Sequence, residues 1–542
     1  MTLKNKLKNQ SHDVIWNYYC GFLDLSMDQY MAIQNRLMLE QIGLWSGSEL
    51  GKSILKGKKP NSIDEFRKMV PLTTYDDYAD ILLQKRSESL PENPIIWIQT
   101  TWEGGKHPIK VAPYTRSMLD VYRTNVTACL ILATSTAKGK ISVDETDKLL
   151  YGLAPLPFAT GLLPLALNEE IDIQFLPAVK DAVDMTFSER NKAGFKLALR
   201  KDVELFFGMG SVAYAISQSL ASITSSGAHG GIASLLKCEP KMVYRILKAK
   251  QTCKKENREL KPKDLFKLKG FMVAGTDNKC YKDELEELWG IRPMEIFAGT
   301  EPSLIGTETS SRDGMHFFPD ACFYEFISEK DMYLTFENPQ YQPKTYLMNE
   351  VVPGEKYEVV LSVLKGGAFA RYRVGDVYRC IGLTNQEDAT RIPRFEYVDR
   401  VPPIIDIAGF TRISEHSIGN AIQLSGLSVS NWTARKTYSE NNRPYMQLYI
   451  EMNKNDLMHA AVNETIIKEL LTTYFKYLDQ DYRDLKKILG IDPLEITLLK
   501  CGTFMAYKNK FGKDVARMNP LHFELRHLID SQENAHPERV VI

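Results

Sequence analysis

Apolar positions follow two different periods along the chain. In residues 13–57 aromatic and aliphatic side chains recur at helical spacing, which predicts two or three helices packed outside a sheet. Residues 271–305 instead alternate short apolar runs with glycine-containing turns. The runs 271–274 and 294–298 flank a stretch, 283–289, whose apolar residues have helical spacing. This order predicts the strand, helix and strand of a βαβ unit.

The rest of the chain supplies further elements of both kinds. We expect a strand at residues 95–98, a helix at about 117–132, buried strands within 149–179, and a β-rich subdomain at 314–364. Strands are expected again at 428–438, 445–452 and 494–499, with a helix at about 455–478. The prediction is an α/β protein. Its large domain, residues 1–398, has sheets flanked by helices plus the β-rich subdomain, and its small domain, residues 399–542, is α+β.

Length, charge and cysteine content limit the classes of protein to which this chain can belong. A chain of 542 residues is too long for one hydrophobic core. Lys plus Arg equals Asp plus Glu at 68 each, so net charge gives no support for nucleic-acid or anionic-membrane partners. The eight cysteines form no Cys-x-x-Cys pair, and no apolar run is long enough to span a bilayer. These features predict a cytoplasmic protein with reduced thiols.

The ends of the two strands in residues 271–305 carry the first candidate chemistry. Gly275 follows one strand, and Gly299, Thr300 and Glu301 follow the other. Open α/β sheets bind ligands at the carboxyl ends of their strands. A hydroxyl and a carboxylate at that edge can contact a phosphate and a magnesium ion. A surface loop that happens to end in Thr-Glu remains the alternative for this stretch alone.

Three motifs in fixed order resemble the adenylate-forming superfamily, which includes acyl-CoA synthetases and amino-acid adenylation domains. They are Phe297-Ala-Gly-Thr-Glu301, Ala370-Arg-Tyr-Arg-Val-Gly-Asp-Val377, and Asp399-Arg400 followed by Asp406-Ile-Ala-Gly-Phe-Thr-Arg-Ile413. Residues 70–78, Val-Pro-Leu-Thr-Thr-Tyr-Asp-Asp-Tyr, resemble two of its groups, the auxin-responsive acyl-acid amido synthetases and the phenylacetate-CoA ligases. The form of the second motif, Tyr-Arg-Val-Gly-Asp-Val, resembles that of the amido synthetases.

This resemblance implies a role for each matching residue. The aromatic Phe297 stacks on adenine, Thr300 touches the α-phosphate, and Glu301 holds Mg²⁺ and takes part in catalysis. The ATP site also includes Gly275, Gly299, Asp376 on the ribose hydroxyls, and Arg400 on a phosphate or the ribose. Asp399 is the implied hinge before the small domain, which acts as a lid. In that lid Lys513 is the candidate catalytic lysine, with Lys510 behind it.

The expected phosphate loop departs from the family pattern. Residues 99–110 read Gln-Thr-Thr-Trp-Glu-Gly-Gly-Lys-His-Pro-Ile-Lys, with Trp102 and Glu103 where the family has a Ser-Gly-Thr core. The residues carried over to ATP binding are Thr100, Thr101, Gly104 and Gly105, with Lys106 as a catalytic lysine and Lys110 as the alternative basic residue. Glycine amides, hydroxyls and a lysine suit a polyphosphate. A plain hairpin turn between two strands is the other interpretation.

The implied reaction activates a carboxylic acid with ATP and Mg²⁺ as an acyl-adenylate and transfers the acyl group to an amine, such as an amino acid, to form an amide. Two alternatives stay open. One is an acyl-CoA ligase of the phenylacetate type, and the other is a non-catalytic nucleotide-binding relative with a degenerate phosphate loop. The expected partners are therefore a small carboxylic acid and an amine, with neither nucleic acid nor membrane. The sequence leaves open the two substrates, the acyl-pocket residues and the oligomeric state.

Overall fold

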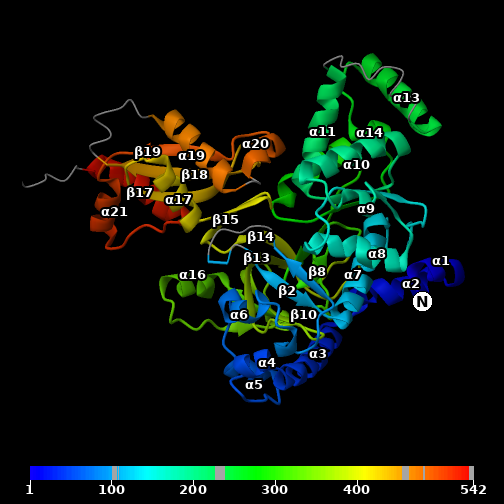
Figure 1. Ribbon diagram of the computed structural model, residues 1–542, viewed down its shortest axis with the longest axis horizontal. Coiled ribbons are helices and arrows are strands. Elements are labelled where there is room, and N and C mark those ends of the chain that lie inside the picture. Colours follow the sequence, from blue (N-terminus) through cyan, green and yellow to red (C-terminus); the bar gives the residue numbers. More distant parts are fainter. Residues whose placement is uncertain (101–105, 108, 226–237, 454–462, 480–481, 536–542) are drawn as a thin grey trace, which may run out of the picture. The chain divides into compact units, whose positions relative to one another are not determined.

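The computed structural model describes all residues except 101–105, 108, 226–237, 454–462, 480–481 and 536–542 (Figure 1). The described residues divide into two compact units. The first comprises the described residues of 1–101 and 109–398, and the second comprises those of 102–108 and 399–542.

The first unit begins with helices. These are α1 (Leu3–Asn9), α2 (His12–Cys20), α3 (Met27–Gly47), α4 (Glu49–Ile54), α5 (Ile63–Met69) and α6 (Ala79–Leu82). Ser26 starts α3 with a capping box, because its hydroxyl accepts from the Gln29 amide while the Gln29 side chain accepts from the Ser26 amide. The side chain of Gln34 donates to the carbonyl of Cys322, which ties α3 to a distant strand. The helices expected at residues 13–57 are confirmed.

The main sheet has seven strands in the order β4-β3-β5-β6-β7-β8-β9. Its strands are β3 (Lys148–Tyr151), β4 (Gln174–Leu176), β5 (Leu205–Gly208), β6 (Gly270–Val273), β7 (Met294–Gly299), β8 (Ser303–Thr307) and β9 (His316–Phe317). The pairs from β4 to β7 are parallel, and β8 and β9 turn the sheet antiparallel. Because β6 and β7 are parallel and α15 (Lys282–Trp289) connects them, the predicted βαβ unit is confirmed.

The remaining helices of this unit come between and around these strands. They are α7 (Arg116–Thr134), α8 (Leu162–Glu170), α9 (Val179–Ala182), α10 (Phe187–Lys201), α11 (Gly210–Ser225), α13 (Pro240–Glu256) and α14 (Pro262–Leu265). Trp289 of α15 packs against the rings of Phe206, Phe266 and Phe271. This aromatic contact buries the connecting helix against β5 and β6.

A second sheet follows in the order β11-β10-β12-β13-β14. Its strands are β10 (Cys322–Ser328), β11 (Thr345–Tyr346), β12 (Lys356–Val363), β13 (Tyr372–Gly382) and β14 (Arg394–Arg400). The β-rich subdomain is therefore present, but a helix, α16 (Glu329–Glu337), interrupts the expected meander. Ser328 caps that helix by accepting the Asp331 amide, a start signal that the apolar pattern alone does not contain.

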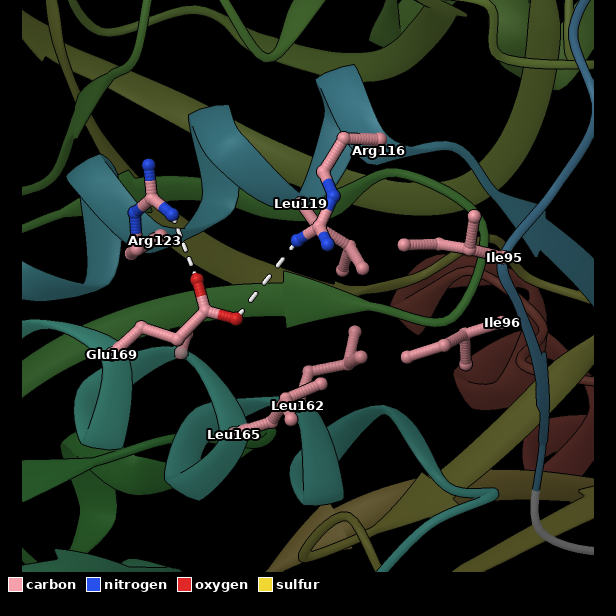
Figure 2. Close-up of a pocket in the computed structure, with 9 residues that line it drawn as sticks. Ile95, Ile96, Arg116, Leu119, Arg123, Leu162, Leu165 and Glu169 are labelled. Carbon is pink, nitrogen blue, oxygen red and sulfur yellow. Dashed lines mark hydrogen bonds and ion pairs between the residues drawn. The ribbon is translucent and has the colours of Figure 1, made fainter.

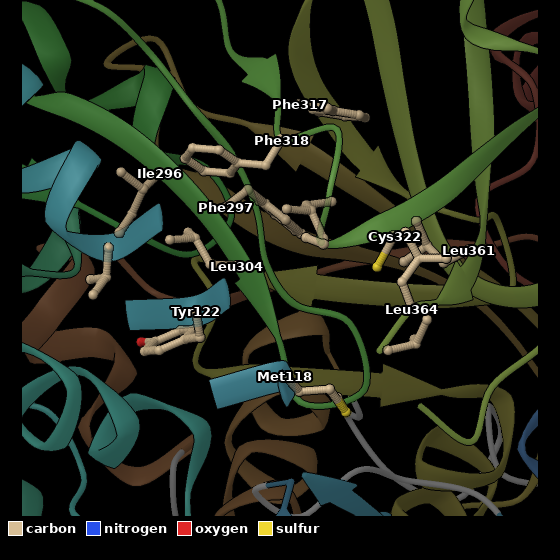
Figure 3. Packing of buried hydrophobic residues seen from close by; sticks show 14 of the residues in the cluster. Met118, Tyr122, Ile296, Phe297, Leu304, Phe317, Phe318, Cys322, Leu361 and Leu364 are labelled. Carbon is tan, nitrogen blue, oxygen red and sulfur yellow. The ribbon is translucent and has the colours of Figure 1, made fainter. Parts of the chain in front are cut away.

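One apolar core joins both sheets to α7. Met118 and Tyr122 of α7 belong to the same buried cluster as Ile296, Phe297 and Leu304 of β7 and β8 (Figure 3). The cluster continues through Phe317, Phe318, Cys322, Leu361 and Leu364. The strands that carry the candidate residues are thus fixed by a packed core on the side of this helix.

The second unit is α+β, as predicted. A hairpin of β15 (Ile404–Ile407) and β16 (Thr411–Ser414) leads into α17 (Glu415–Ser425). Its sheet is β17 (Val429–Tyr438), β18 (Pro444–Met452) and β19 (Leu494–Leu499), flanked by α19 (Glu464–Leu478), α20 (Tyr482–Leu489), α21 (Thr503–Phe511) and α22 (His522–Asp530). The helix expected from about residue 455 is described from Glu464, where Asn463 caps it. Residues 455–462 lie outside the described part.

Two global features of the described residues bear on function. No helix among them combines the length and apolar character that a bilayer span needs. All eight cysteines have unbonded thiols, and several of them, such as Cys20 and Cys322, are buried.

Candidate active site

The candidate loops sit at the carboxyl ends of two neighbouring parallel strands. Gly275 comes two residues after β6 and has a φ of +107°, a backbone conformation that strongly favours glycine. Thr300 and Glu301 come directly after β7, and the Glu301 side chain is buried. Because β6 and β7 pair in parallel, both loops emerge at the same edge of the sheet.

Glu301 is held by side chains from two other segments. The hydroxyl of Tyr372 on β13 donates to its Oε1 at 2.7 Å, and Lys110 Nζ lies 3.9 Å from the same oxygen. Among the described residues Oε2 has no hydrogen-bond partner. Tyr114 donates to the carbonyl of Thr300 at 2.8 Å, and burial raises the pKa of Tyr114 well above its usual value. Tyr114 therefore remains a neutral donor that fixes this loop.

Asp376 and Phe297 are joined through a third residue, the aromatic Tyr397. The rings of Phe297 and Tyr397 stack with centroids 5.1 Å apart and planes 20° apart. The Tyr397 hydroxyl donates to Asp376 Oδ1 at 3.5 Å. Asp376 also lies on β13, the strand that supplies Tyr372 to Glu301. The structure thus brings Phe297, Glu301 and Asp376 into one neighbourhood of the first unit. Phe297 lies within the core and is only 6% exposed, so Tyr397 covers one side of the ring expected to meet adenine.

The expected phosphate loop connects an antiparallel strand pair, β1 (Ile96–Gln99) and β2 (Val111–Tyr114). This is the hairpin of the alternative interpretation, and it is compatible with both. Thr100 is buried, and its hydroxyl accepts the Lys110 amide at 3.0 Å, so this hydroxyl fixes the base of the hairpin. Thr101, Gly104 and Gly105 lie outside the described residues. Lys106 is exposed, whereas Lys110, the alternative lysine, is the one beside Glu301.

The other candidates belong to the second unit. Asp399 Oδ1 accepts the Arg400 amide at 2.8 Å and pairs with Lys436 Nζ at 3.1 Å. Lys513 follows Gly512, whose φ of +71° ends α21, and its Nζ pairs with Glu524 at 2.8 Å. The predicted glycine turn before Lys513 is therefore present. The lysine is held by an acidic residue of its own unit.

Sequence reasoning missed the tyrosines that hold the site. Tyr372 lies inside a recognised motif, but the motif assigns it no role. Tyr397 and Tyr114 lie in strand-like runs, where an aromatic residue is more often ordinary core. Each places a phenolic hydroxyl on a residue more than twenty positions away in sequence. Only the sheet pairing reveals these contacts.

A separate surface cavity of about 200 Å³ lies between β1, α7 and α8. Ile96, Leu119 and Leu162 form part of its apolar wall, and Glu169 bridges Arg116 and Arg123 at its rim (Figure 2). It contains none of the candidate residues.

The described residues contain no cluster of three or more His, Cys, Asp or Glu side chains arranged to hold a metal ion. A protein-only metal centre is thus not seen in this part of the chain. A magnesium ion that keeps most of its ligands from water and substrate phosphates requires only one or two carboxylates.

Two segments of the chain match models of a known protein family. Residues 315–400 match the GH3 family central domain, and residues 415–520 match the GH3 family C-terminal domain. The chain carries GH3 family domains. This confirms the resemblance to acyl-acid amido synthetases of the adenylate-forming superfamily that the motifs indicate.

Curated relatives are similar over part of the chain. A probable indole-3-acetic acid-amido synthetase GH3.9 of Oryza sativa subsp. japonica is 28% identical over 163 residues, which are 28% of this chain and 35% of that protein. The indole-3-acetic acid-amido synthetase GH3.15 of Arabidopsis thaliana is 28% identical over 199 residues, 35% of this chain and 32% of that protein. The matched segments span about a third of each relative.

Solved structures show the fold over nearly the whole chain. The GH3.15 acyl acid amido synthetase in complex with 2,4-DB has a TM-score of 0.52 at 18% identity, covering 94% of this chain and 95% of that one. A 2-hydroxyisobutyryl-CoA ligase in complex with 2-HIB-AMP and CoA has a TM-score of 0.53 at 14% identity, covering 88% and 87%. The fold is therefore that of adenylate-forming enzymes.

Proposed function

We propose that this protein is an ATP-dependent carboxylate–amine ligase. It activates a small carboxylic acid as an acyl-adenylate and transfers the acyl group to an amine, with an amino acid as the favoured acceptor. The observation that carries this proposal is the convergence of Glu301, Phe297 and Asp376 in one unit of a chain with GH3 family domains.

The first half-reaction is attack of the substrate carboxylate on the α-phosphate of ATP, with pyrophosphate leaving. Asp376 suits the ribose, because a carboxylate can accept hydrogen bonds from both hydroxyls of a vicinal diol. Thr300 supplies a hydroxyl for the α-phosphate. Lys110, beside Glu301, brings positive charge toward oxygens that repel one another as they converge. Most of the gain in rate then comes from positioning.

Glu301 fits the magnesium ion that accompanies ATP. Tyr372 occupies Oε1, and Oε2 is left without a hydrogen bond among the described residues. Such an ion, when bound, would offset the negative charge of the phosphates. The part played by the protein is to hold this carboxylate still in a buried position. Tyr372 and the packed β7 do that.

The structure constrains the acceptor of the acyl group, an amine or a thiol, less than it constrains the nucleotide site. An amido synthetase and a CoA ligase fit the fold about equally well, with TM-scores of 0.52 and 0.53. The fold therefore does not separate amine from thiol. Amide formation is favoured because both matched domains are GH3 domains and the similar curated relatives are named amido synthetases.

The second unit is proposed to act as the lid. Asp399, which begins the long segment of this unit, would serve as the hinge, and Arg400 would reach a phosphate or the ribose. Lys513 would leave Glu524 and approach the acyl carboxylate and α-phosphate when the lid closes. The proposed setting for this chemistry is the cytoplasm.

The test is carboxylate-dependent exchange of labelled pyrophosphate into ATP, followed by product mass. The purified chain is supplied with ATP, Mg²⁺ and a panel of carboxylic acids. Acids that support exchange are then incubated with amino acids or with CoA. We expect exchange with at least one acid and a new amide mass. A thioester without amide would favour the CoA-ligase alternative. Nucleotide binding with no exchange across the panel would favour a non-catalytic relative.

Replacing Asp376 by alanine is expected to raise the KM for ATP about 10- to 100-fold. A hydrogen bond to a charged group contributes roughly 1.5–3 kcal/mol, and two ribose hydroxyls depend on this carboxylate. Asp376→Asn should show a smaller effect, because one carbonyl acceptor remains. The measurement is exchange kinetics against ATP concentration. A thermal unfolding curve checks the fold, and an Asp376→Ala protein that fails to fold would make this residue structural instead.

A further inference from the structure

We propose that Asn278 is a positioning residue that holds the ends of β5, β6 and β7 in the geometry the nucleotide site requires. The proposal rests on the function proposed above and adds a residue outside the recognised motifs. Asn278 begins the short 3-10 helix Asn278–Cys280 and is almost fully buried. It does not touch substrate in this assignment. It acts through the two loops that it joins.

The side chain of Asn278 uses its donor and its acceptor on different loops. Nδ2 donates to the carbonyl of Gly275 at 2.7 Å, which lies in the loop after β6. Oδ1 accepts the amide of Gly210 at 3.1 Å, which lies in the turn from β5 into α11. Since β5 and β6 pair in parallel, these turns emerge side by side at the edge of the sheet where ligands bind. One amide group therefore connects both.

The backbone around Asn278 has an uncommon conformation. Gly275 has a φ of +107°, and Asp277, a non-glycine residue, has a φ of +59°. A non-glycine residue in the left-handed region, such as Asp277, costs free energy and persists where the surroundings hold it. Asn278 also lies close to Gly210, because a Cβ added at Gly210 would lie only 2.9 Å from Asn278 Oδ1. The loop shape and the glycine at position 210 both depend on where this amide sits.

A buried charge cluster connects Asn278 to the third strand. Lys282 Nζ pairs with Glu308 at 2.5 Å and with Glu295 of β7 at 3.1 Å. Burial raises the pKa of Glu295, while the positive charge of Lys282 opposes the rise. Glu295 is two residues before Phe297 and six before Glu301. Lys282 is four residues after Asn278, so the segment that Asn278 anchors also holds, through this ion pair, the strand that ends in the candidate carboxylate.

Asparagine suits this place because its side chain carries both a donor and an acceptor. Alanine would remove both contacts. Aspartate would keep an acceptor for Gly210 but would set an anionic oxygen against the carbonyl of Gly275. Aspartate regains a donor only when protonated. This difference makes the contact testable by pH.

The experiment measures pyrophosphate exchange of the full chain with Asn278→Ala, Asn278→Ser, Asn278→Asp and Gly210→Ala. Gly210→Ala disturbs the same contact from the opposite loop. We expect kcat for exchange to fall at least tenfold in Asn278→Ala and Gly210→Ala, with Asn278→Ser between these and wild type. Asn278→Asp should recover relative to wild type as the pH falls from 8 to 6, because protonation restores the donor to Gly275.

Two control variants remove comparable features elsewhere. Asn338 also accepts a backbone amide, that of Gln340 at 3.0 Å, but at an exposed turn. Gly43 lies in α3, and no neighbouring atom comes within 4 Å of the place that a Cβ would take, so alanine fits there without contact. Asn338→Ala and Gly43→Ala should leave the exchange kinetics and their pH profile unchanged.

The outcomes separate this inference from the proposed function. Exchange by wild type together with wild-type kinetics in folded Asn278→Ala or Gly210→Ala would overturn the role of Asn278. If wild type shows no exchange with any acid, the proposed function fails, and the Kd for ATP, measured by calorimetry, then decides about Asn278. An unchanged Kd in these variants would overturn the role, and a Kd raised tenfold or more would support it.

Discussion

Glu301→Gln is expected to lower pyrophosphate exchange by about 100- to 1,000-fold at saturating ATP and Mg²⁺. The substitution keeps the size of the side chain and an oxygen that can accept from Tyr372, but it removes the charge proposed to face magnesium. Losing one preorganised electrostatic group at a site of developing charge typically costs this much. The KM for ATP should change far less than kcat, because the lost charge matters most as pyrophosphate leaves.

A matched control is Glu329→Gln. Glu329 pairs with Lys356 at 2.8 Å, but both side chains are at least a third exposed, and such surface pairs contribute little. Its exchange activity should remain within a factor of two of wild type. Both variants should unfold at temperatures close to that of wild type. Full activity in a folded Glu301→Gln protein would remove Glu301 from the catalytic site and leave the surface-loop interpretation of residues 299–301.

Much of the framework of this site could be predicted from the sequence. The βαβ unit between residues 271 and 299 follows from short apolar runs, glycine and a helical period, and all of these are local signals. The strands of the second unit follow for the same reason. Gly275 was recognisable because a glycine at a strand end suits a backbone that other residues avoid, and its φ of +107° shows why.

The contacts that complete the site could not be predicted from local sequence signals. Tyr372, Tyr397 and Asn278 act on residues of other strands or loops, and the relevant distances are set by sheet order and register. Nothing local distinguishes Asn278 from an ordinary turn residue, since asparagine is common in turns. The position of Lys110 beside Glu301 likewise depends on the pairing of β1 with β2. Helix α16 was missed because a single capping serine, not a long apolar pattern, begins it.

Arg371 shows how the structure beneath the site is supported. This buried residue directly precedes Tyr372 and has a φ of +47°. Its Nε and one terminal nitrogen pair with the two oxygens of Glu325, each at 2.9 Å. Its other terminal nitrogen donates to the carbonyls of Arg67 and Val70 at 2.6 Å. Arg371 therefore ties β13 to β10 and to the end of α5.

Arg371→Met is expected to lower the free energy of unfolding by about 3 kcal/mol. Removing one partner of a buried ion pair typically costs 3–5 kcal/mol, because the other charge stays buried. The lower end applies here, since Arg67 Nε and the Thr345 hydroxyl still bind Glu325. The measurement is denaturant unfolding of the full chain, with attention to the transition of the first unit, because a chain of two units need not unfold in one step.

Two further variants test the cause of this loss in stability. They are Arg379→Met and the double variant Arg371→Met/Glu325→Gln. Arg379 lies on the same strand but is 41% exposed, and it faces Glu396 at 3.8 Å, so its loss should cost at most about 1 kcal/mol. Neutralising Glu325 in the double variant should recover part of the stability, because the buried Glu325 side chain then no longer carries a charge that has lost Arg371. Equal losses at Arg371 and Arg379 would contradict this account. If Arg371 does hold β13, its loss should also weaken exchange, because the hydroxyl of Tyr372 would no longer be fixed against Glu301.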